Sequence, residues 1–302
     1  MAHVEAHHTQ AKPPARPKRD WPFQVTPLGD VLGCEITGIT LQDAVSPKLF
    51  AKVYEAFLDY ELILFRNVDL PPATQVAFAK NFGEVNIHVL SQYHGYGHPE
   101  IYMLSNKVDG KPSGKHPDRG TLYWHTDGSW KERTGQATMM YSEELPPPGK
   151  GGETQFADMY RGYEILPADI KKKIEGRNAI HNFTFSRKRR HGEDPLTAKQ
   201  SAEVPPVAHP IVRTHPETGR KAIFLGDHAE SIEGMPYDEG RALIEEINVL
   251  TTPPDNIYSH IWKPRECMVW DNRCTLHRAT GFDESQYIRV MRRCTITGDK
   301  PF

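Results

Sequence analysis

The stretch TLYWHTDGSW, residues 121–130, places a histidine and an aspartate two positions apart among aromatic and β-branched residues. Alternate side chains of a β-strand share one face of the sheet. If residues 122–128 form a strand or a strand end, His125 and Asp127 point toward a common centre and Thr126 points away. From this stretch alone, half of a metal site and a polar pair on a surface strand both stay open.

A second stretch, MVWDNRCTLHRAT at 268–280, supplies another histidine. His277 follows an apolar strand, a turn-forming Asp271-Asn272 pair and a second short strand. Two histidines and one carboxylate form the facial triad of non-haem Fe(II) oxygenases, which leaves metal positions open for a bidentate oxoacid and dioxygen. A zinc hydrolase with the same three ligands is an alternative, and iron-dependent oxygen uptake would separate the two.

The last strand-like segment, YIRVMRRCTITG at 287–298, carries two arginines on one face. Arg289 and Arg293 are four positions apart, so in a strand they point the same way. Two buried guanidinium groups are costly without anionic partners. Either core ion pairs with Asp or Glu, or two anionic ligands such as a 2-oxo diacid and a substrate, would satisfy them.

Composition sets broad limits on this chain of 302 residues. A formal net charge of -2 gives no sign of general nucleic-acid binding, and no apolar run is long enough to span a bilayer. The first twenty residues lack the apolar stretch of a secretory signal. Four cysteines without C-x-x-C spacing favour reduced thiols in a cytoplasmic protein.

The basic stretch SRKRRH at 186–191 is interpreted as a solvated loop near the active-site entrance. Two alternatives stay open for it. It could bind nucleic acid, or it could steer an acidic substrate, in which case the Michaelis constant would depend sharply on salt.

Short strands and a few helices alternate along the chain, which indicates a mainly β fold with flanking helices. We expect residues 1–20, rich in Pro, His, Lys and Arg, to be a mobile tail, and residues 21–302 to form a single domain. The segments 92–100 and 109–120 are expected to be mobile loops over a pocket. Helices are expected at 46–60, 73–83, 159–176 and 238–252.

Four motifs together resemble the taurine dioxygenase family of Fe(II)/2-oxoglutarate-dependent oxygenases, which includes 2,4-dichlorophenoxyacetate dioxygenase and alkylsulfatase. They are WHTD at 124–127, GGETQFADM at 151–159, VWDNRCTLHRAT at 269–280 and RVMRRCTITGDKPF at 289–302. They occur in the family's order and at similar spacing, and the resemblance extends from about Trp21 to the C-terminus. It implies a double-stranded β-helix, or jelly-roll, core.

The resemblance also implies roles for individual residues. The iron ligands would be His125, Asp127 and His277, and the distal carboxylate of 2-oxoglutarate would be held by Thr154 and Arg289. The substrate would be contacted by Arg293 at its anionic group, by His88 and by an aromatic wall at Phe183. The alternative for His88 is that it is a surface histidine at a helix-to-strand turn, with its hydrogen bonds made and no role in substrate binding.

Departures from the taurine enzymes lie around the substrate. Ser91 stands where those enzymes carry a tyrosine that contacts the sulfonate, and Thr121 stands where they carry an asparagine. The segment from His277 to Arg289 is also one residue longer. This pattern predicts the family's chemistry on a substrate other than taurine.

We therefore expect a dioxygenase that uses Fe(II), 2-oxoglutarate and O2 to hydroxylate a small organic anion, releasing succinate and CO2. A sulfonate, an alkyl sulfate or an aryloxyalkanoate would suit Arg293, and a heteroatom leaving group on the hydroxylated carbon would lead to bond cleavage. A trimethylammonium or amino-acid substrate is the alternative, with Tyr93, Tyr96 and Tyr123 as candidates for an aromatic cage. A non-catalytic jelly-roll binding protein is the alternative of another class. We expect no nucleic-acid or membrane partner, and a homo-oligomer, dimer or tetramer, as in many members of the family.

Overall fold

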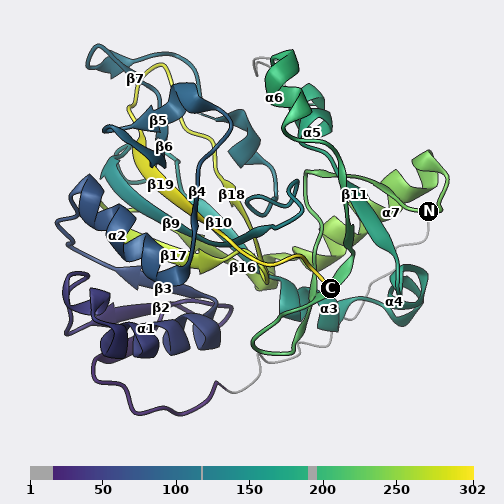
Figure 1. The fold of residues 1–302 in the computed structure, drawn as a ribbon, viewed down its shortest axis with the longest axis horizontal. Helices are drawn as coiled ribbons and strands as arrows, with labels where there is room; N and C mark the ends of the chain where they lie inside the picture. The colour runs from purple at the N-terminus through teal and green to yellow at the C-terminus, as the bar shows by residue number, and fades with distance from the viewer. Residues whose placement is uncertain (1–15, 117, 190–195) are drawn as a thin grey trace.

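The structure is a computed structural model that describes residues 16–116, 118–189 and 196–302. Strands outnumber helices in these residues, and the helices flank the sheets (Figure 1). The prediction of a mainly β fold with flanking helices is thus confirmed. No helix of the described residues has both the length and the apolar character needed to cross a membrane.

A nine-stranded sheet forms the larger layer. Its order is β1-β2-β3-β17-β9-β19-β6-β5, with β4 paired to β19. Neighbouring strands are antiparallel, except for the parallel pair β2 and β3. The strands are β1 (Gln24–Pro27), β2 (Cys34–Thr37), β3 (Leu62–Phe65), β4 (Val85–Asn86), β5 (His94–Gly95), β6 (His98–Ser105), β9 (Gly135–Glu144), β17 (Cys267–Asp271) and β19 (Val290–Thr297).

A smaller antiparallel sheet, in the order β16-β10-β18, faces the larger one. It consists of β10 (Thr154–Asp158), β16 (Ile257–His260) and β18 (Thr275–Ala279). Between the two sheets, Phe156 of β10 packs edge-on against Trp270 of β17, with ring centroids 5.2 Å apart. Met291 of β19 belongs to the same apolar cluster. The face of β19 that carries Met291 and Arg293 therefore points into the space between the sheets.

Two helices, α1 (Pro47–Tyr60) and α2 (Pro72–Phe82), cover the other face of the larger sheet (Figure 1). Phe57 of α1 and Phe78 of α2 pack in one cluster with Cys294 and Ile296 of β19. Cys294 and Ile296 therefore lie on the face of β19 opposite Met291 and Arg293. Pro47 occupies the first turn of α1, where its missing N–H costs nothing.

A third group of elements surrounds a separate apolar cluster. Its helices are α3 (Met159–Ile165), α4 (Ala168–Ile174) and α7 (Tyr237–Thr251), and its strands are β11 (Asn178–His181), β12 (Val207–Pro210), β13 (Val212–Thr214), β14 (Lys221–Ile223) and β15 (Ala229–Ile232). The single helix predicted at 159–176 is wrong in detail. Pro167 has no N–H to continue the helical hydrogen bonding, so the segment divides into α3 and α4.

The two segments predicted to be loops contain short strands. Residues 92–100 contribute β5 and the start of β6, and β7 (Lys107–Val108) pairs with β8 (Lys111–Pro112) as a hairpin. Two short helices, α5 (Phe183–Arg189) and α6 (Ala198–Ala202), lie near this end of the molecule (Figure 1). Of the predicted tail, residues 1–15 lie outside the described residues. Arg16 lies over the ring of Tyr60, and Arg19 donates to Asp59, so these two residues contact α1.

Candidate active site

The two histidines of the sequence motifs meet through the backbone. The N–H of His125 donates to the carbonyl of His277 at 3.0 Å, and the reverse bond measures 2.8 Å. This single antiparallel bridge places the two rings 4.2 Å apart, centroid to centroid. The regular strand expected around His125 is absent, because residues 119–122 form a 3-10 turn and only the bridge is strand-like.

Asp127 completes a buried cluster of three candidate metal ligands, two imidazoles and one carboxylate. Its Oδ1 lies 3.8 Å from His125 Nε2, and its Oδ2 lies 3.8 Å from His277 Nε2. All three ligand atoms lie within 4.8 Å of one another. A divalent metal binds such atoms at about 2.0–2.2 Å, so one ion can contact all three after a small adjustment.

The protonation of both imidazoles suits a metal. His125 Nδ1 lies 2.7 Å from the carbonyl of Tyr123, to which it donates, so its Nε2 keeps a lone pair that faces Asp127. Burial lowers the pKa of His277 well below its usual value, and the neutral form is the one that binds metal.

Asp127 is held as an anion by its surroundings. Burial alone would raise its pKa, but Arg293, 3.2 Å from Oδ1, together with the hydrogen bond from Thr138, holds that pKa below its usual range. Thr138 Oγ1 donates to Oδ2 at 2.6 Å and accepts a bond from Asn272 Nδ2 at 2.9 Å. Asn272 Oδ1 accepts in turn from the indole of Trp270 at 3.0 Å. The carboxylate is therefore oriented before any metal arrives.

Thr154 lies next to this cluster because of strand register. Phe156 of β10 pairs with His277 of β18, and Thr154 pairs with Ala279, so Thr154 and His277 lie on the same face. The indole Nε1 of Trp262 donates to Thr154 Oγ1 at 2.8 Å. The hydroxyl hydrogen of Thr154 is thus available for a further acceptor.

Arg289 is a buried cation close to the same strand. Its Nε donates to the carbonyl of Gly152 at 3.2 Å, and burial lowers its pKa to about 10, with Glu153 opposing that shift only in part. A buried guanidinium in this state favours an anionic ligand. Arg289 is thus bonded to the residue two positions before Thr154, and the role that the family resemblance implies for both residues, holding the distal carboxylate of 2-oxoglutarate, stays a prediction.

A cavity opens at the metal cluster, and the three residues predicted to contact a substrate all line it: His88, Phe183 and Arg293. Phe183 packs against Trp130 with ring centroids 4.6 Å apart. His88 is 5.9 Å from Trp130 and 6.2 Å from Phe183, and burial lowers its pKa to about 3, so it is neutral. The wall of the cavity includes the rings of Trp130, Phe183 and His88, and Arg293 lies beside Asp127 in the same lining.

The family model described as taurine catabolism dioxygenase TauD, TfdA family matches residues 24–295. The chain belongs to this family. The family resemblance predicted from the four motifs is therefore confirmed.

Curated relatives of this TauD, TfdA family member cover nearly its whole length. An α-ketoglutarate-dependent 2,4-dichlorophenoxyacetate dioxygenase from Burkholderia sp. (strain RASC) is 35% identical over 87% of this chain and 91% of its own. An (S)-phenoxypropionate/α-ketoglutarate dioxygenase from Sphingobium herbicidovorans is 31% identical over 92% and 96%. These names confirm the prediction of a 2-oxoglutarate-dependent non-haem iron dioxygenase.

The fold agrees with solved structures. The crystal structure of AAD-2 with Mn(II) and N-oxalylglycine superimposes with a TM-score of 0.77 at 30% identity, covering 92% of this chain and 98% of that one. The crystal structure of a putative α-ketoglutarate-dependent 2,4-D dioxygenase from Burkholderia xenovorans superimposes with a TM-score of 0.78 at 27% identity. It covers 91% of this chain and 96% of that one.

Sequence reasoning missed several residues of this dioxygenase site. Thr138 and Asn272 orient Asp127, and Arg187 and His228 line the cavity. Asn272 had a local signal, as part of the turn-forming Asp271-Asn272 pair, and Arg187 had one, as part of the basic stretch 186–191 expected near the active-site entrance. Thr138 and His228 lie on segments whose approach to the cavity depends on tertiary packing.

We expect Thr138→Val to weaken metal binding by about 10- to 100-fold, because it removes a hydrogen bond to the carboxylate and leaves the Asn272 amide without its acceptor. The dissociation constant for Mn(II), measured by equilibrium dialysis, tests this. Thr138→Ser should restore most of the affinity, and Thr297→Val in β19 is the matched control. Unchanged Mn(II) affinity in Thr138→Val would contradict the role given to Thr138.

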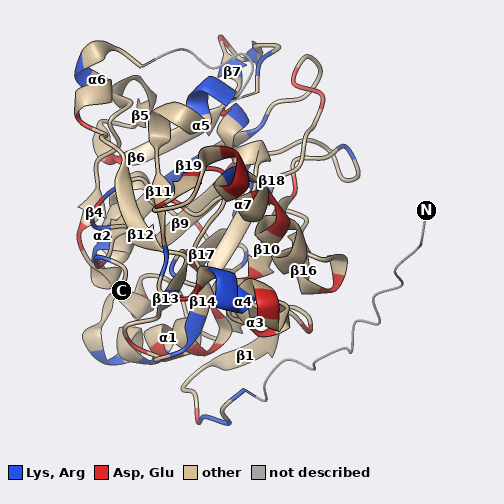
Figure 2. Ribbon diagram, turned by 90° about the vertical axis from the view of Figure 1, so that its right-hand side faces the viewer, with Lys and Arg blue, Asp and Glu red and all other residues tan. Residues whose placement is uncertain are grey.

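The basic stretch predicted as a solvated loop belongs in part to α5. Figure 2 shows basic residues on α5 and acidic residues on α7. Arg187 of α5 lines the cavity, and Arg189 lies 3.3 Å from Glu245 of α7. The described part of the basic stretch 186–191 therefore includes a cavity residue and an ion pair. Residues 190 and 191 lie outside the described residues.

A second buried cluster consists of His215, Asp271 and Cys274. His215 Nδ1 accepts from the backbone N–H of Thr218 at 3.2 Å, so its Nε2 carries the proton and donates to Asp271 at 3.1 Å. Arg273 Nη2 donates to the same carboxylate at 2.7 Å. Both ring nitrogens and the carboxylate are thus engaged within the protein, and the cluster serves to hold the turn that precedes His277.

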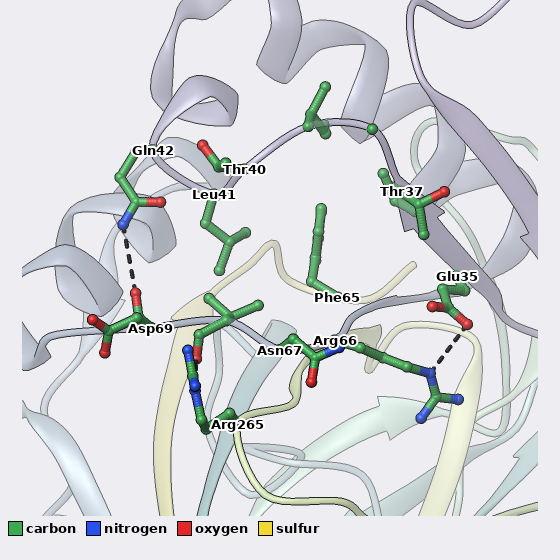
Figure 3. A pocket seen from close by; sticks show the side chains of 14 residues that line it. Glu35, Thr37, Thr40, Leu41, Gln42, Phe65, Arg66, Asn67, Asp69 and Arg265 are labelled. Atoms are coloured by element: carbon green, nitrogen blue, oxygen red, sulfur yellow. Dashed lines mark hydrogen bonds and ion pairs between the residues drawn. The ribbon is translucent and has the colours of Figure 1, made fainter.

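A different cavity lies between the residues around β2 and the segment after β3 (Figure 3). Its polar groups pair with one another. Arg66 donates to Glu35 at 3.1 Å and pairs with Glu266, and Arg265 donates to the carbonyl of Val68. None of His125, Asp127 and His277 lines this cavity, so we do not assign the catalytic site to it.

Proposed function

We propose that this chain binds Fe(II) through His125, Asp127 and His277 and hydroxylates a small organic anion. The observation that carries the proposal is the buried cluster of two imidazoles and one carboxylate beside an aromatic cavity. Bound iron would supply the activation of dioxygen, with 2-oxoglutarate as the co-reductant that is released as succinate and CO2. The two facing sheets support a double-stranded β-helix core within a single domain spanning residues 21–302.

Thr154 and Arg289 are proposed to hold the distal carboxylate of 2-oxoglutarate. The hydroxyl hydrogen of Thr154 and the guanidinium of Arg289 supply the donors that a carboxylate needs. Both side chains are 4% exposed, so the ion pair with this carboxylate would be shielded from water. These two residues therefore fix the orientation of the cosubstrate relative to the metal ligands.

An aryloxyalkanoate is the substrate class that we favour. Trp130, Phe183 and His88 present ring surfaces to the cavity, and Arg293 supplies the cation for a carboxylate. The relatives with the names given above act on 2,4-dichlorophenoxyacetate and phenoxypropionate. A trimethylammonium substrate has less support, because Tyr96 donates to Glu143 and is 55% exposed, and Tyr123 is 43% exposed.

The cysteines bear on the cellular location that we propose for the enzyme. Its four cysteines are free and buried, which supports reduced thiols and a cytoplasmic location. We also propose a homo-oligomer, dimer or tetramer, without a nucleic-acid or membrane partner.

The test is succinate formation by the iron-loaded protein with 2-oxoglutarate and a panel of aryloxyalkanoates, alkyl sulfates, sulfonates, quaternary amines and amino acids. We expect an aryloxyalkanoate to raise succinate well above the uncoupled rate, with cleaved product formed in step. A different responding class would replace our choice of substrate but keep the reaction. No iron-dependent succinate with any compound, or in their absence, would favour the non-catalytic binding protein.

A further inference from the structure

His116 is a buried histidine with one ring nitrogen unused. The residue is 8% exposed, and its Nδ1 accepts a hydrogen bond from the backbone N–H of Asp118 at 3.2 Å. The proton of the neutral ring therefore lies on Nε2. Within the described part of the chain, this Nε2 has no hydrogen-bond partner, although it is shielded from solvent. A buried donor of this kind is costly unless a ligand accepts its hydrogen.

Hydrogen bonds join the loop that carries His116 to the loop that carries Arg289. The side chain of Asn106 accepts from the backbone N–H of Arg289 at 2.7 Å and donates to the carbonyl of Tyr287 at 2.9 Å. The N–H of Gly114 also donates to the carbonyl of Glu284 at 3.2 Å. These bonds span both sides of the 106–116 segment, so His116 is held beside the 282–289 segment.

Phe282 connects the His116 ring with the segment that contacts Arg289. The two ring centroids are 5.7 Å apart, and Phe282 forms an isolated bridge with Gly151. The next residue, Gly152, accepts from Arg289 Nε at 3.2 Å. Gly151 has no room for a side chain, since a Cβ would lie 2.0 Å from the carbonyl oxygen of Gly281. Burial, and after it the charge of Arg289, lower the pKa of His116, so the ring stays neutral beside the guanidinium.

We propose that His116 is a further cosubstrate-binding residue, whose Nε2–H donates to the carboxylate that Arg289 pairs with. The inference rests on the proposed function, in which this carboxylate is the distal one of 2-oxoglutarate. The carboxylate then receives donors of three kinds: the guanidinium of Arg289, the hydroxyl of Thr154 and the imidazole of His116. A neutral imidazole fits here, because it adds a donor without a second buried positive charge.

The test is calorimetric binding of 2-oxoglutarate to the full-length, Mn(II)-loaded protein, which requires no turnover. His116→Phe keeps a ring against Phe282 but removes the donor, and we expect the dissociation constant to rise about 10- to 100-fold. His116→Gln keeps an N–H donor at similar reach and should recover most of the affinity. The second ligand is 2-oxopentanoate, in which a methyl group replaces the distal carboxylate. Its affinity should be the same in wild type and His116→Phe.

Three results would count against these ideas in distinguishable ways. Wild-type affinity for 2-oxoglutarate in His116→Phe would overturn the role of His116 and leave the proposed function intact. An equal loss for both ligands would also overturn it, because the effect would then not depend on the distal carboxylate. If wild type itself shows no saturable binding of 2-oxoglutarate, both the proposed function and this inference fail. A melting temperature for each variant within a few degrees of wild type shows that the comparison concerns folded protein.

Discussion

Asp127→Asn will abolish turnover almost completely, with kcat/KM lowered at least about 1,000-fold, equivalent to about 4 kcal/mol of transition-state stabilisation. The asparagine keeps the size and shape of the side chain but removes its negative charge. That charge lies 3.8 Å from both histidine Nε2 atoms and 3.2 Å from Arg293. A divalent metal brought to this site would then face the Arg293 cation without an anionic ligand to offset the repulsion.

Two measurements test whether Asp127 binds the metal. Metal content after anaerobic loading with Fe(II) should fall in Asp127→Asn, while succinate formation falls with it. Asp283→Asn is the matched control, since Asp283 lies in an exposed turn where its carboxylate accepts from the backbone and hydroxyl of Ser285. Asp127→Asn protein that holds iron as tightly as wild type and turns over within tenfold of it would contradict the assignment of Asp127 as a metal ligand.

The three candidate metal ligands could be predicted because they lie in short sequence motifs. His125 and Asp127 are two positions apart, and this spacing brings them to one side even though the segment is a turn and a bridge instead of a strand. The turn replaces the strand because the chain folds back on itself. Gly128 has a φ of 71°, and a Cβ there would lie 2.8 Å from the backbone N of Gly135.

The residues that support the cluster could not be predicted in the same way. Thr138 and Asn272 are 134 positions apart, and they meet only because β9 pairs with β17. A threonine in a strand has no local feature that marks it as a partner of a metal ligand. His116 is similar, since its position beside Arg289 depends on hydrogen bonds between two loops far apart in the chain. Local patterns predict which side chains carry chemistry, while strand register and loop contacts decide what surrounds them.

Asp271→Ala will lower the free energy of unfolding by about 3–5 kcal/mol, the usual cost of removing one partner from a buried ion pair. Asp271 is 1% exposed and accepts from Arg273 at 2.9 Å and 2.7 Å and from His215 at 3.1 Å. Without the carboxylate, the Arg273 guanidinium keeps only Glu217 as an ion-pair partner among the described residues. We expect the melting temperature to fall by about 10 °C. Glu132→Ala, which breaks an exposed pair with Lys300, should change stability by no more than about 0.5 kcal/mol.

The dependence of this contribution on pH gives a second, independent measurement. Burial alone would raise the pKa of Asp271, but Arg273 and His215 outweigh it and hold the pKa below its usual value. A carboxyl whose pKa is lower in the folded state stabilises the protein above its unfolded pKa of about 3.9, and this stability is lost as the pH falls below that value. The stability difference between wild type and Asp271→Asn should therefore stay constant from pH 7 to about 5, begin to shrink below about pH 5 and shrink further toward pH 2. A stability difference that stays constant over the whole of this range would show that Asp271 contributes through packing and not through its charge.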